Sequence, residues 1–383
     1  MGVISIRPPR ARRRAATARP GAGSLRRNVL RLAVLAIICL FYALSSDASN
    51  LFLLNTCLLA AVSAIALDFL MGTAGQPSLG TTAFLGLGGF GVVFMMRAGL
   101  PYLPALIVCA VAAAVGGLLL GLPSLRLRGV YLALATLGAY FFMNYVGTNY
   151  QDKTAGPAGF VLSPLFGSAS DIEQQRYWCL LLFGVVAVVS IVMQQLTSGR
   201  AGRALRMVRD HETAAPALGI PVVRYKLLVF VLYAVVTTIA GSLGAVFLGN
   251  VSTDSYSLTT TISYVAMIVI GGMDSVTGAM IGAFVVTLLP TFVANETTAL
   301  GGTTFAATYG SSVSEGIYGL AILVLVTSGR SGLAGLGSTV YRFIRDKVPG
   351  GRLRSGAPPS PPPVSPPSAE PAVSEPGSPP EGT

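Results

Sequence analysis

Long apolar segments recur along most of this sequence and limit its fold more than any other feature. Ten of them approach or exceed the roughly 20 residues that a helix needs to cross a membrane. They are predicted at residues 28–46, 51–71, 79–97, 101–122, 128–149, 177–197, 225–248, 260–273, 276–294 and 313–328. Only 11% of the residues are charged, whereas soluble domains average about 25%. The sequence therefore predicts an all-α, polytopic membrane protein with about ten transmembrane segments.

Two of these segments depart from a continuous span. Segment 260–273 is short for a hydrocarbon core of ~30 Å and is predicted to be a half-helix. Segment 79–97 is rich in glycine and overlaps the stretch GQPSLGTTAF. Pro77 and the glycines beside it disfavour a continuous helix. Some spans are therefore expected to be broken.

Lysine and arginine are distributed unevenly between the predicted loops. If the N-terminus is cytoplasmic, all of the 26 basic residues except Arg97, Lys153 and Arg176 lie on the cytoplasmic side. This is the bias expected of a membrane protein with an even number of spans and both termini inside. The net charge of +11 is therefore a topology signal, and no nucleic-acid partner is expected.

The chain divides into three parts by composition. Residues 1–27 form a basic segment, predicted to be a cytoplasmic tail, although with Leu32 to Leu44 they also fit the start of a signal peptide. Residues 28–337 form the transmembrane domain. Residues 338–383 are predicted to be a second cytoplasmic tail, rich in proline and disordered from residue 355.

The sequence offers little catalytic chemistry. It contains no G-x-x-x-x-G-K-[ST] motif, so the chain is not expected to hydrolyse ATP, and we predict no catalytic residue, metal or cofactor. The four cysteines are expected to be small buried hydrophobes; they are Cys39, Cys57, Cys109 and Cys179. Gly86 to Gly91 match G-x-G-x-x-G, but no carboxylate lies between Asp68 and Asp152 to bind a ribose. These glycines are instead predicted to allow close helix packing.

The longest internal cytoplasmic loop spans residues 199–226 and has two interpretations. Its arginines recur every third residue, at 200, 203, 206 and 209, opposite Leu205 and Val208. This pattern fits a helix lying on anionic lipid. It also fits an arm that carries a short docking helix from Asp210, as N-cap, to Gly219, as stop. Pro216 would kink the middle of that helix.

Several long stretches resemble the branched-chain amino acid ABC transporter permease family, in its LivM-like branch. They are GQPSLGTTAFLGLGGF, LRLRGVYLALATLGAY, GRALRMVRDHETAAPALGIPVVRYKLLVFV, AMIVIGGMDSVTGAMIGA and IYGLAILVLVTSGRSGLAGL. The resemblance implies a permease subunit that imports branched-chain or related small amino acids or amides across the bacterial cytoplasmic membrane. It also implies the partners: a second permease in a heterodimer, two cytoplasmic ABC ATPases and an extracytoplasmic substrate-binding protein.

The resemblance extends to the cytoplasmic loop, where E-x-A-A-x-x-x-G resembles the ATPase-contacting loop of ABC importers. The residues that it implies for ATPase coupling are Arg206, Asp210, Glu212, Ala214, Ala215 and Gly219. The chain departs from the family pattern at Pro77, Thr81 and Pro216. The first two departures concern the substrate preference, and the third concerns the regularity of the coupling helix.

A polar path for the solute is predicted around the broken span. Half-helix N-termini offer donors to a carboxylate without a buried cation. The candidate residues are Gln76, Ser78, Thr81, Thr82 and Asn144. Capping and packing are the alternative role for each. The alternative class is an ATPase-independent secondary transporter or channel, which the scarcity of intramembrane carboxylates, Asp68 and Asp274, disfavours.

Overall fold

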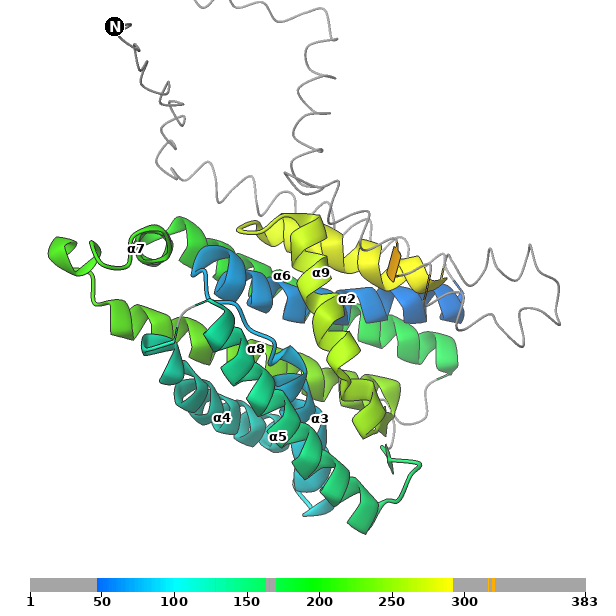
Figure 1. Cartoon of the computed structure of the whole chain (residues 1–383). Helices are drawn as coiled ribbons and strands as arrows, with labels where there is room; N and C mark the ends of the chain where they lie inside the picture. The colour runs from blue at the N-terminus through cyan, green and yellow to red at the C-terminus, as the bar shows by residue number, and fades with distance from the viewer. Residues whose placement is uncertain are drawn as a thin grey trace, which may run out of the picture. The chain divides into compact units, whose positions relative to one another are not determined.

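Helices make up nearly all of the regular structure (Figure 1). The computed structural model describes residues 47–291, apart from 128, 163, 164 and 166–169, together with residues 316, 319 and 320. The predicted segment 28–46, nearly all of 313–328 and both predicted tails lie outside these residues. The all-α prediction is confirmed for the described part, whereas the number of ten spans and the cytoplasmic termini stay predictions.

Among the described residues, five helices are long and apolar enough to cross a membrane, and three apolar helices are shorter. The long ones are α2 (Ala48–Asp68, extended by the π-helical turn η1, Phe69–Thr73), α4 (Tyr102–Gly121, followed by η2, Pro123–Leu125), α5 (Val130–Thr154), α6 (Asp171–Ser198) and α8 (Val222–Leu248). The shorter ones are α3 (Thr81–Arg97), α9 (Leu258–Gly271) and the helix Val276–Thr291. The predicted short segment 260–273 is thus confirmed as the 14-residue α9.

The predicted break lies before α3 and not inside it. Residues 74–80 are not helical, and the chain becomes helical at Thr81. Gly75 adopts φ +69°, a left-handed conformation that glycine accepts readily, and Pro77 follows where a helix would lose a hydrogen bond. From Thr81 to Arg97 the helix is continuous despite its glycines.

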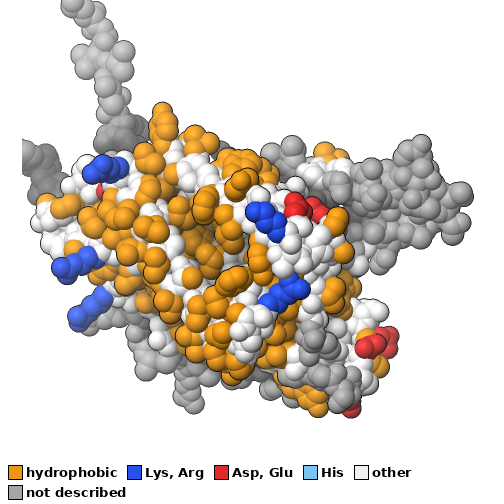
Figure 2. Space-filling model, turned by 90° about the horizontal axis from the view of Figure 1, so that it is seen from below, with side chains coloured by type: hydrophobic (Ala, Val, Ile, Leu, Met, Phe, Trp, Pro, Cys, Tyr) orange, Lys and Arg blue, Asp and Glu red, His pale blue; other side chains and the backbone are white. Residues whose placement is uncertain are grey.

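Exposed apolar side chains form stripes along the outer faces of the helices. On α4 the exposed residues Leu103, Ile107, Val111, Val115 and Leu119 recur every fourth position. Small residues at the same spacing face inward; they are Ala105, Cys109, Ala113, Gly117 and Gly121. Figure 2 shows a broad band of hydrophobic side chains on the face seen from below, with charged side chains mostly towards its two sides. Such a band is what a hydrocarbon environment requires.

Glycines allow α3 to pack closely against α8. A Cβ on Gly88 would overlap the carbonyl oxygen of Thr238, and a Cβ on Gly241 would overlap that of Leu85. The two helices therefore meet backbone to backbone, as small residues permit in membranes. This confirms the packing interpretation of Gly86 to Gly91 at Gly88.

The helices have two chemically different ends. At one end lies α7 (Arg200–Asp210), followed by the 3₁₀ turn η3 (Pro216–Leu218). At the other end, β1 (Phe160–Val161) pairs antiparallel with β2 (Asn250–Val251), and Phe160 lies opposite Val251. The turn η4 (Thr253–Tyr256) follows β2 and leads into α9. We refer to these as the α7 end and the β1 end.

Candidate functional site

The arginine-rich arm is itself a helix, α7, with two distinct faces. Leu205 and Val208 are buried, whereas Arg203 and Arg209 are exposed. The predicted division of the arm into a basic and an apolar face is confirmed. Because its apolar face is buried against the helices, α7 is a fixed part of the bundle.

The prediction of a helix from Asp210 to Gly219 is wrong, whereas the docking role of these residues stays a prediction. Asp210 is the last residue of α7 and not an N-cap, and Glu212 stands in a turn. The arm is rich in Arg, Ala, Leu and Met, which are good helix formers, so the helix forms there. It ends before Pro216, which has no N–H to donate to the carbonyl of Glu212. Pro216 instead begins η3, where a helix tolerates proline.

The predicted stop at Gly219 is confirmed. Gly219 adopts φ +75° and terminates η3 in a left-handed conformation. Ala215 is buried, whereas Ala214 and Leu218 are exposed, with Leu218 at 66%. The carbonyl of Ala215 accepts hydrogen bonds from the N–H groups of Leu218 and Ile220, at 3.1 and 3.2 Å. Residues 211–219 therefore form a compact turn that presents an apolar side chain to its surroundings; we call it the projecting turn.

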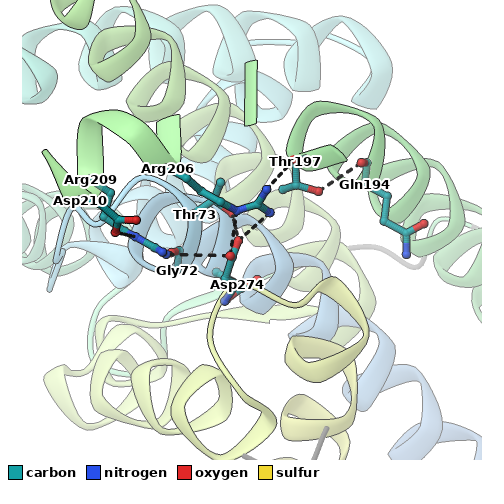
Figure 3. A network of polar contacts seen from close by, with 9 residues as sticks. Gly72, Thr73, Gln194, Thr197, Arg206, Arg209, Asp210 and Asp274 are labelled. Atoms are coloured by element: carbon teal, nitrogen blue, oxygen red, sulfur yellow. Dashed lines mark hydrogen bonds and ion pairs between the residues drawn. The ribbon is translucent and has the colours of Figure 1, made fainter. Parts of the chain in front are cut away.

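A bidentate ion pair joins α7 to the turn after α9 (Figure 3). Arg206 Nε donates to Asp274 Oδ2 at 2.9 Å, and Arg206 Nη2 donates to Oδ1 at 3.1 Å. The remaining guanidinium nitrogen, Nη1, donates to the carbonyl of Thr197 at 3.2 Å. Two parallel bonds restrain the angle as well as the distance between a guanidinium and a carboxylate. Asp274 thus holds α7 in one orientation.

Asp274 connects three parts of the chain. Its carboxylate accepts a third hydrogen bond, from Thr73 Oγ1 at 3.0 Å, and its N–H donates to Asp68 Oδ1 at 2.8 Å. It has φ +65°, and is the only residue other than glycine with positive φ in the described structure. This conformation is uncommon outside glycine, although aspartate tolerates it better than most residues. Side-chain contacts on three elements hold Asp274 in this conformation.

Arg209 of α7 also contacts Asp274 and the turn η1 at the end of α2. Its Nη1 donates to the carbonyl of Gly72 and lies 3.9 Å from Asp274 Oδ2, while its Nε contacts Asp210 Oδ1 at 3.2 Å (Figure 3). A Cβ on Gly75 would lie 2.9 Å from the Cδ of Arg209, so the side chain needs the space that this glycine leaves. The π-helical turn η1 therefore packs directly against α7. Turns of this kind are frequent at functional sites.

A buried lysine anchors the other side of the projecting turn. Lys226 Nζ lies 2.6 Å from Glu212 Oε1 and 3.3 Å from the carbonyl of Ser124. The side chain of Lys226 is 7% exposed and that of Glu212 is 23% exposed. A buried ammonium without a counter-charge is strongly destabilising, so Glu212 is required where Lys226 is buried. The sequence resemblance implies an ATPase-coupling role for Glu212, and no sequence pattern predicts its pairing with Lys226.

The predicted solute-path residues separate into three groups. Thr81 accepts from Tyr233 Oη at 3.0 Å, and Ser78 Oγ accepts from the N–H of Gly80 at 3.3 Å, so both have partners within the protein. Thr82 and Asn144 line one pocket between α3 and α5, although the hydroxyl of Thr82 also lies 2.6 Å from the hydroxyl of Thr261. Gln76 is buried, and neither its amide nitrogen nor its amide oxygen has a hydrogen-bond partner among the described residues.

Apolar helices of spanning length, outward apolar stripes and inward polar groups define a multi-pass integral membrane protein, the class that includes solute permeases. The chain belongs to the family of permease components of branched-chain amino acid transport systems. The family model described as "Branched-chain amino acid transport system / permease component" matches residues 49–327. This confirms the resemblance, and the family is one of transport proteins.

Two relatives are the high-affinity branched-chain amino acid transport system permease proteins LivM of Salmonella typhimurium and Escherichia coli. Each is 27% identical over 278 residues, which is 66% of this chain and 65% of the relative. The chain therefore spans about 65% of the length of these relatives. The structure of PsaBC from Streptococcus pneumoniae in complex with Fab matches with a TM-score of 0.42 and 13% identity, over 80% of this chain and 99% of that one. These values are too low to support a conclusion about the fold.

Proposed function

We propose that this chain is one permease subunit of an ABC importer in the bacterial cytoplasmic membrane. It carries branched-chain amino acids or related small amino acids and amides, and separate ATPase subunits supply the energy. Its partners are a second permease, two cytoplasmic ATPases and an extracytoplasmic substrate-binding protein. The family membership and the names of the LivM relatives support the solute class.

The projecting turn at the α7 end is the observation that carries this proposal. Leu218 is exposed on the projecting turn. Two ion pairs hold this turn and the preceding helix α7 in place, Arg206 with Asp274 and Lys226 with Glu212. An apolar side chain on a rigid, basic support suits a groove on another protein. In this proposal the α7 end is cytoplasmic, and an ATPase docks on the projecting turn. Movement of the ATPase then passes through α7 and Asp274 to α9.

Leu218→Asp is expected to remove the docked ATPase. An aspartate in an apolar groove would have to be desolvated without a partner, so copurification of the ATPase should fall about tenfold or more. The measurement is the ratio of ATPase to permease after gentle purification of the transporter expressed with all its subunits.

Val161→Asp is the matched control for this experiment. Val161 is 84% exposed, and it lies on β1 at the opposite end of the helices. Undiminished ATPase in Leu218→Asp, or an equal loss in both variants, would contradict the docking proposal. Uptake by the chain alone in liposomes, driven by an ion gradient, would support a secondary transporter instead.

Gln76→Leu is expected to reduce uptake without reducing stability. A buried amide without partners costs roughly 1–3 kcal/mol, and an apolar replacement of similar size removes that cost. We therefore expect the thermal midpoint to stay the same or rise, while solute uptake falls about tenfold because a solute contact is lost. Thr237→Val is the control, because it also removes a buried polar atom without a partner among the described residues, at a position on α8 that is not among the predicted path residues. Unchanged uptake in Gln76→Leu would leave Gln76 with a packing role only.

A further inference from the structure

A small pocket lies between α3, α5 and η4. Its polar lining comes from Thr82, Tyr140, Asn144, Thr253 and Tyr256, with Phe90 and Met143 as its main apolar residues. No lysine, arginine, aspartate or glutamate is among the lining residues that the structure describes. The free space is about 10 Å³, roughly the space for one water molecule. The pocket is therefore closed to any solute in this conformation.

The ring of Tyr256 closes the pocket by lying across glycines of α3. A Cβ on Gly89 would overlap Tyr256 Oη and lie 2.8 Å from its Cζ, whereas a Cβ on Gly86 would stay 3.7 Å from Tyr256 Cγ. The ring also packs against Phe90, with 5.6 Å between the ring centroids. Tyr256 can occupy this place only because position 89 has no side chain.

A buried glutamine at the β1 end holds η4 in the closed position. Gln151 Oε1 accepts from the N–H of Thr253 at 2.9 Å and from its Oγ1 at 3.2 Å. Gln151 Nε2 donates to the carbonyls of Gly156 and Pro157, at 3.3 and 3.4 Å. One amide thus ties the end of α5 to both the turn before β1 and η4. These are neutral hydrogen bonds, each of modest net strength, so they can break and re-form during a working cycle.

We propose that this pocket is the closed form of a solute-binding site and that η4 is its lid. Tyr256 is the closing side chain, and Gln151 is the latch. The proposal rests on the proposed function as a permease and adds where the solute is held and what must move to admit it.

The lining indicates the chemical class of the solute. Hydroxyl and amide groups can donate to a carboxylate and accept from an ammonium group, but they cannot neutralise a net charge. Burying an uncompensated charge in such a place is costly. Phe90 and Met143 offer contact to an apolar side chain. The site therefore fits a small zwitterionic or neutral solute with an apolar portion, and it disfavours solutes with a net charge.

Access to the pocket can be measured with a cysteine at position 144. Asn144→Cys is introduced after Cys39, Cys57, Cys109 and Cys179 have been replaced by alanine, in the complete transporter in sealed vesicles. A membrane-impermeant maleimide added on the side of β1 reports how often the lid is open. Gly89→Ala is expected to raise the labelling rate about tenfold, because the added methyl group displaces Tyr256. Tyr256→Ala, which removes the ring without adding bulk, is expected to raise it as well.

Gly138→Ala is the matched control, on α5 and outside the lining of the pocket. Its added methyl group would meet no described atom within 4 Å, so the labelling rate should not change. Unchanged labelling in both Gly89→Ala and Tyr256→Ala would overturn the lid, and so would an equal rise in Gly138→Ala. Copurification of the other subunits shows that each variant is folded.

Solute protection tests the binding site itself. In Tyr256→Ala combined with Asn144→Cys, leucine is expected to slow the labelling of the introduced thiol, whereas glutamate and arginine are not. No protection by leucine, or equal protection by the charged amino acids, would overturn the proposed site or its solute class. Labelling needs no ATP hydrolysis, so its outcome is separate from the ATPase-docking test with Leu218→Asp.

Discussion

Asp274→Asn is expected to reduce ATP-driven uptake about tenfold while the chain still reaches the membrane and still binds its ATPases. Asparagine accepts the same left-handed backbone conformation, so the substitution removes the charge and leaves the turn intact. The carboxylate accepts two hydrogen bonds from Arg206 and one from Thr73, and all three weaken when it becomes an amide. The projecting turn, which we propose docks the ATPase, would then move without carrying α9 with it.

The size of this effect follows from the geometry and exposure of the pair. Hydrogen bonds to a charged group contribute about 1.5–3 kcal/mol, whereas fully exposed ion pairs contribute about 0–1 kcal/mol. The side chains of Arg206 and Asp274 are 34% and 26% exposed, so solvent screens part of the interaction. A loss of about 1–2 kcal/mol, or roughly tenfold in coupling, lies between these limits.

Two further variants make the test of Asp274 specific. Arg206→Gln should behave like Asp274→Asn, and the double variant should be no worse than either, because each change removes the same interaction. Arg203→Gln should leave uptake unchanged, since Arg203 donates only to the carbonyl of Ser198 within the described hydrogen bonds. The measurements are solute uptake and ATPase rate in proteoliposomes. Normal uptake in Asp274→Asn, or equal damage in Arg203→Gln, would refute the role of this ion pair in coupling.

Gly88→Ala is expected to prevent stable assembly of the helices. Its Cβ would overlap the carbonyl oxygen of Thr238 and lie 2.8 Å from the N–H nitrogen of Ser242. Both atoms belong to the backbone of α8, which cannot turn aside as a flexible side chain can. Overpacking costs about 1–3 kcal/mol even where side chains can adjust, so we expect a larger loss here.

The matched control for Gly88→Ala is Gly86→Ala, which should retain normal stability. Its nearest neighbouring atoms lie 3.7 Å from the added methyl group. Gly241→Ala, on the facing helix α8, should be as damaging as Gly88→Ala, because its Cβ would overlap the carbonyl of Leu85. The amount of monodisperse protein after detergent extraction, and its thermal midpoint, measure the effect. Equal stability of Gly86→Ala and Gly88→Ala would show that α3 and α8 do not pack as described.

Local sequence patterns predicted several parts of the site correctly. The non-helical stretch before α3 follows from Gly75 and Pro77, and the end of the projecting turn follows from Gly219. The two faces of α7 follow from its spacing of arginines and apolar residues. These features depend on backbone freedom and on periodicity within a few residues, and the sequence displays both directly.

Prediction from local patterns failed where two local signals competed. Asp210 is a favourable N-cap residue, but it follows ten residues that already form a helix, so it became the last residue of α7. The sequence predicts that Pro216 kinks a helix, whereas in the structure Pro216 begins the separate 3₁₀ turn η3. Capping preference is worth about 1 kcal/mol, which the packing of Leu205 and Val208 into the core readily exceeds.

The amino-acid sequence is sufficient to predict that this chain forms apolar helices and that the chain is interrupted before α3. Burial in a membrane depends on composition over some twenty residues, so a one-dimensional pattern is sufficient to predict it. Which polar groups contact one another depends on how the helices pack in three dimensions. Arg206 and Asp274 are 68 residues apart in sequence, and Thr82 and Thr261 are 179 apart. No spacing rule relates such pairs, because the packing of the glycine-lined helices, and not the local chain, brings them together. The same packing leaves Gln76 without a partner among the described residues and lays Tyr256 over the glycines of α3.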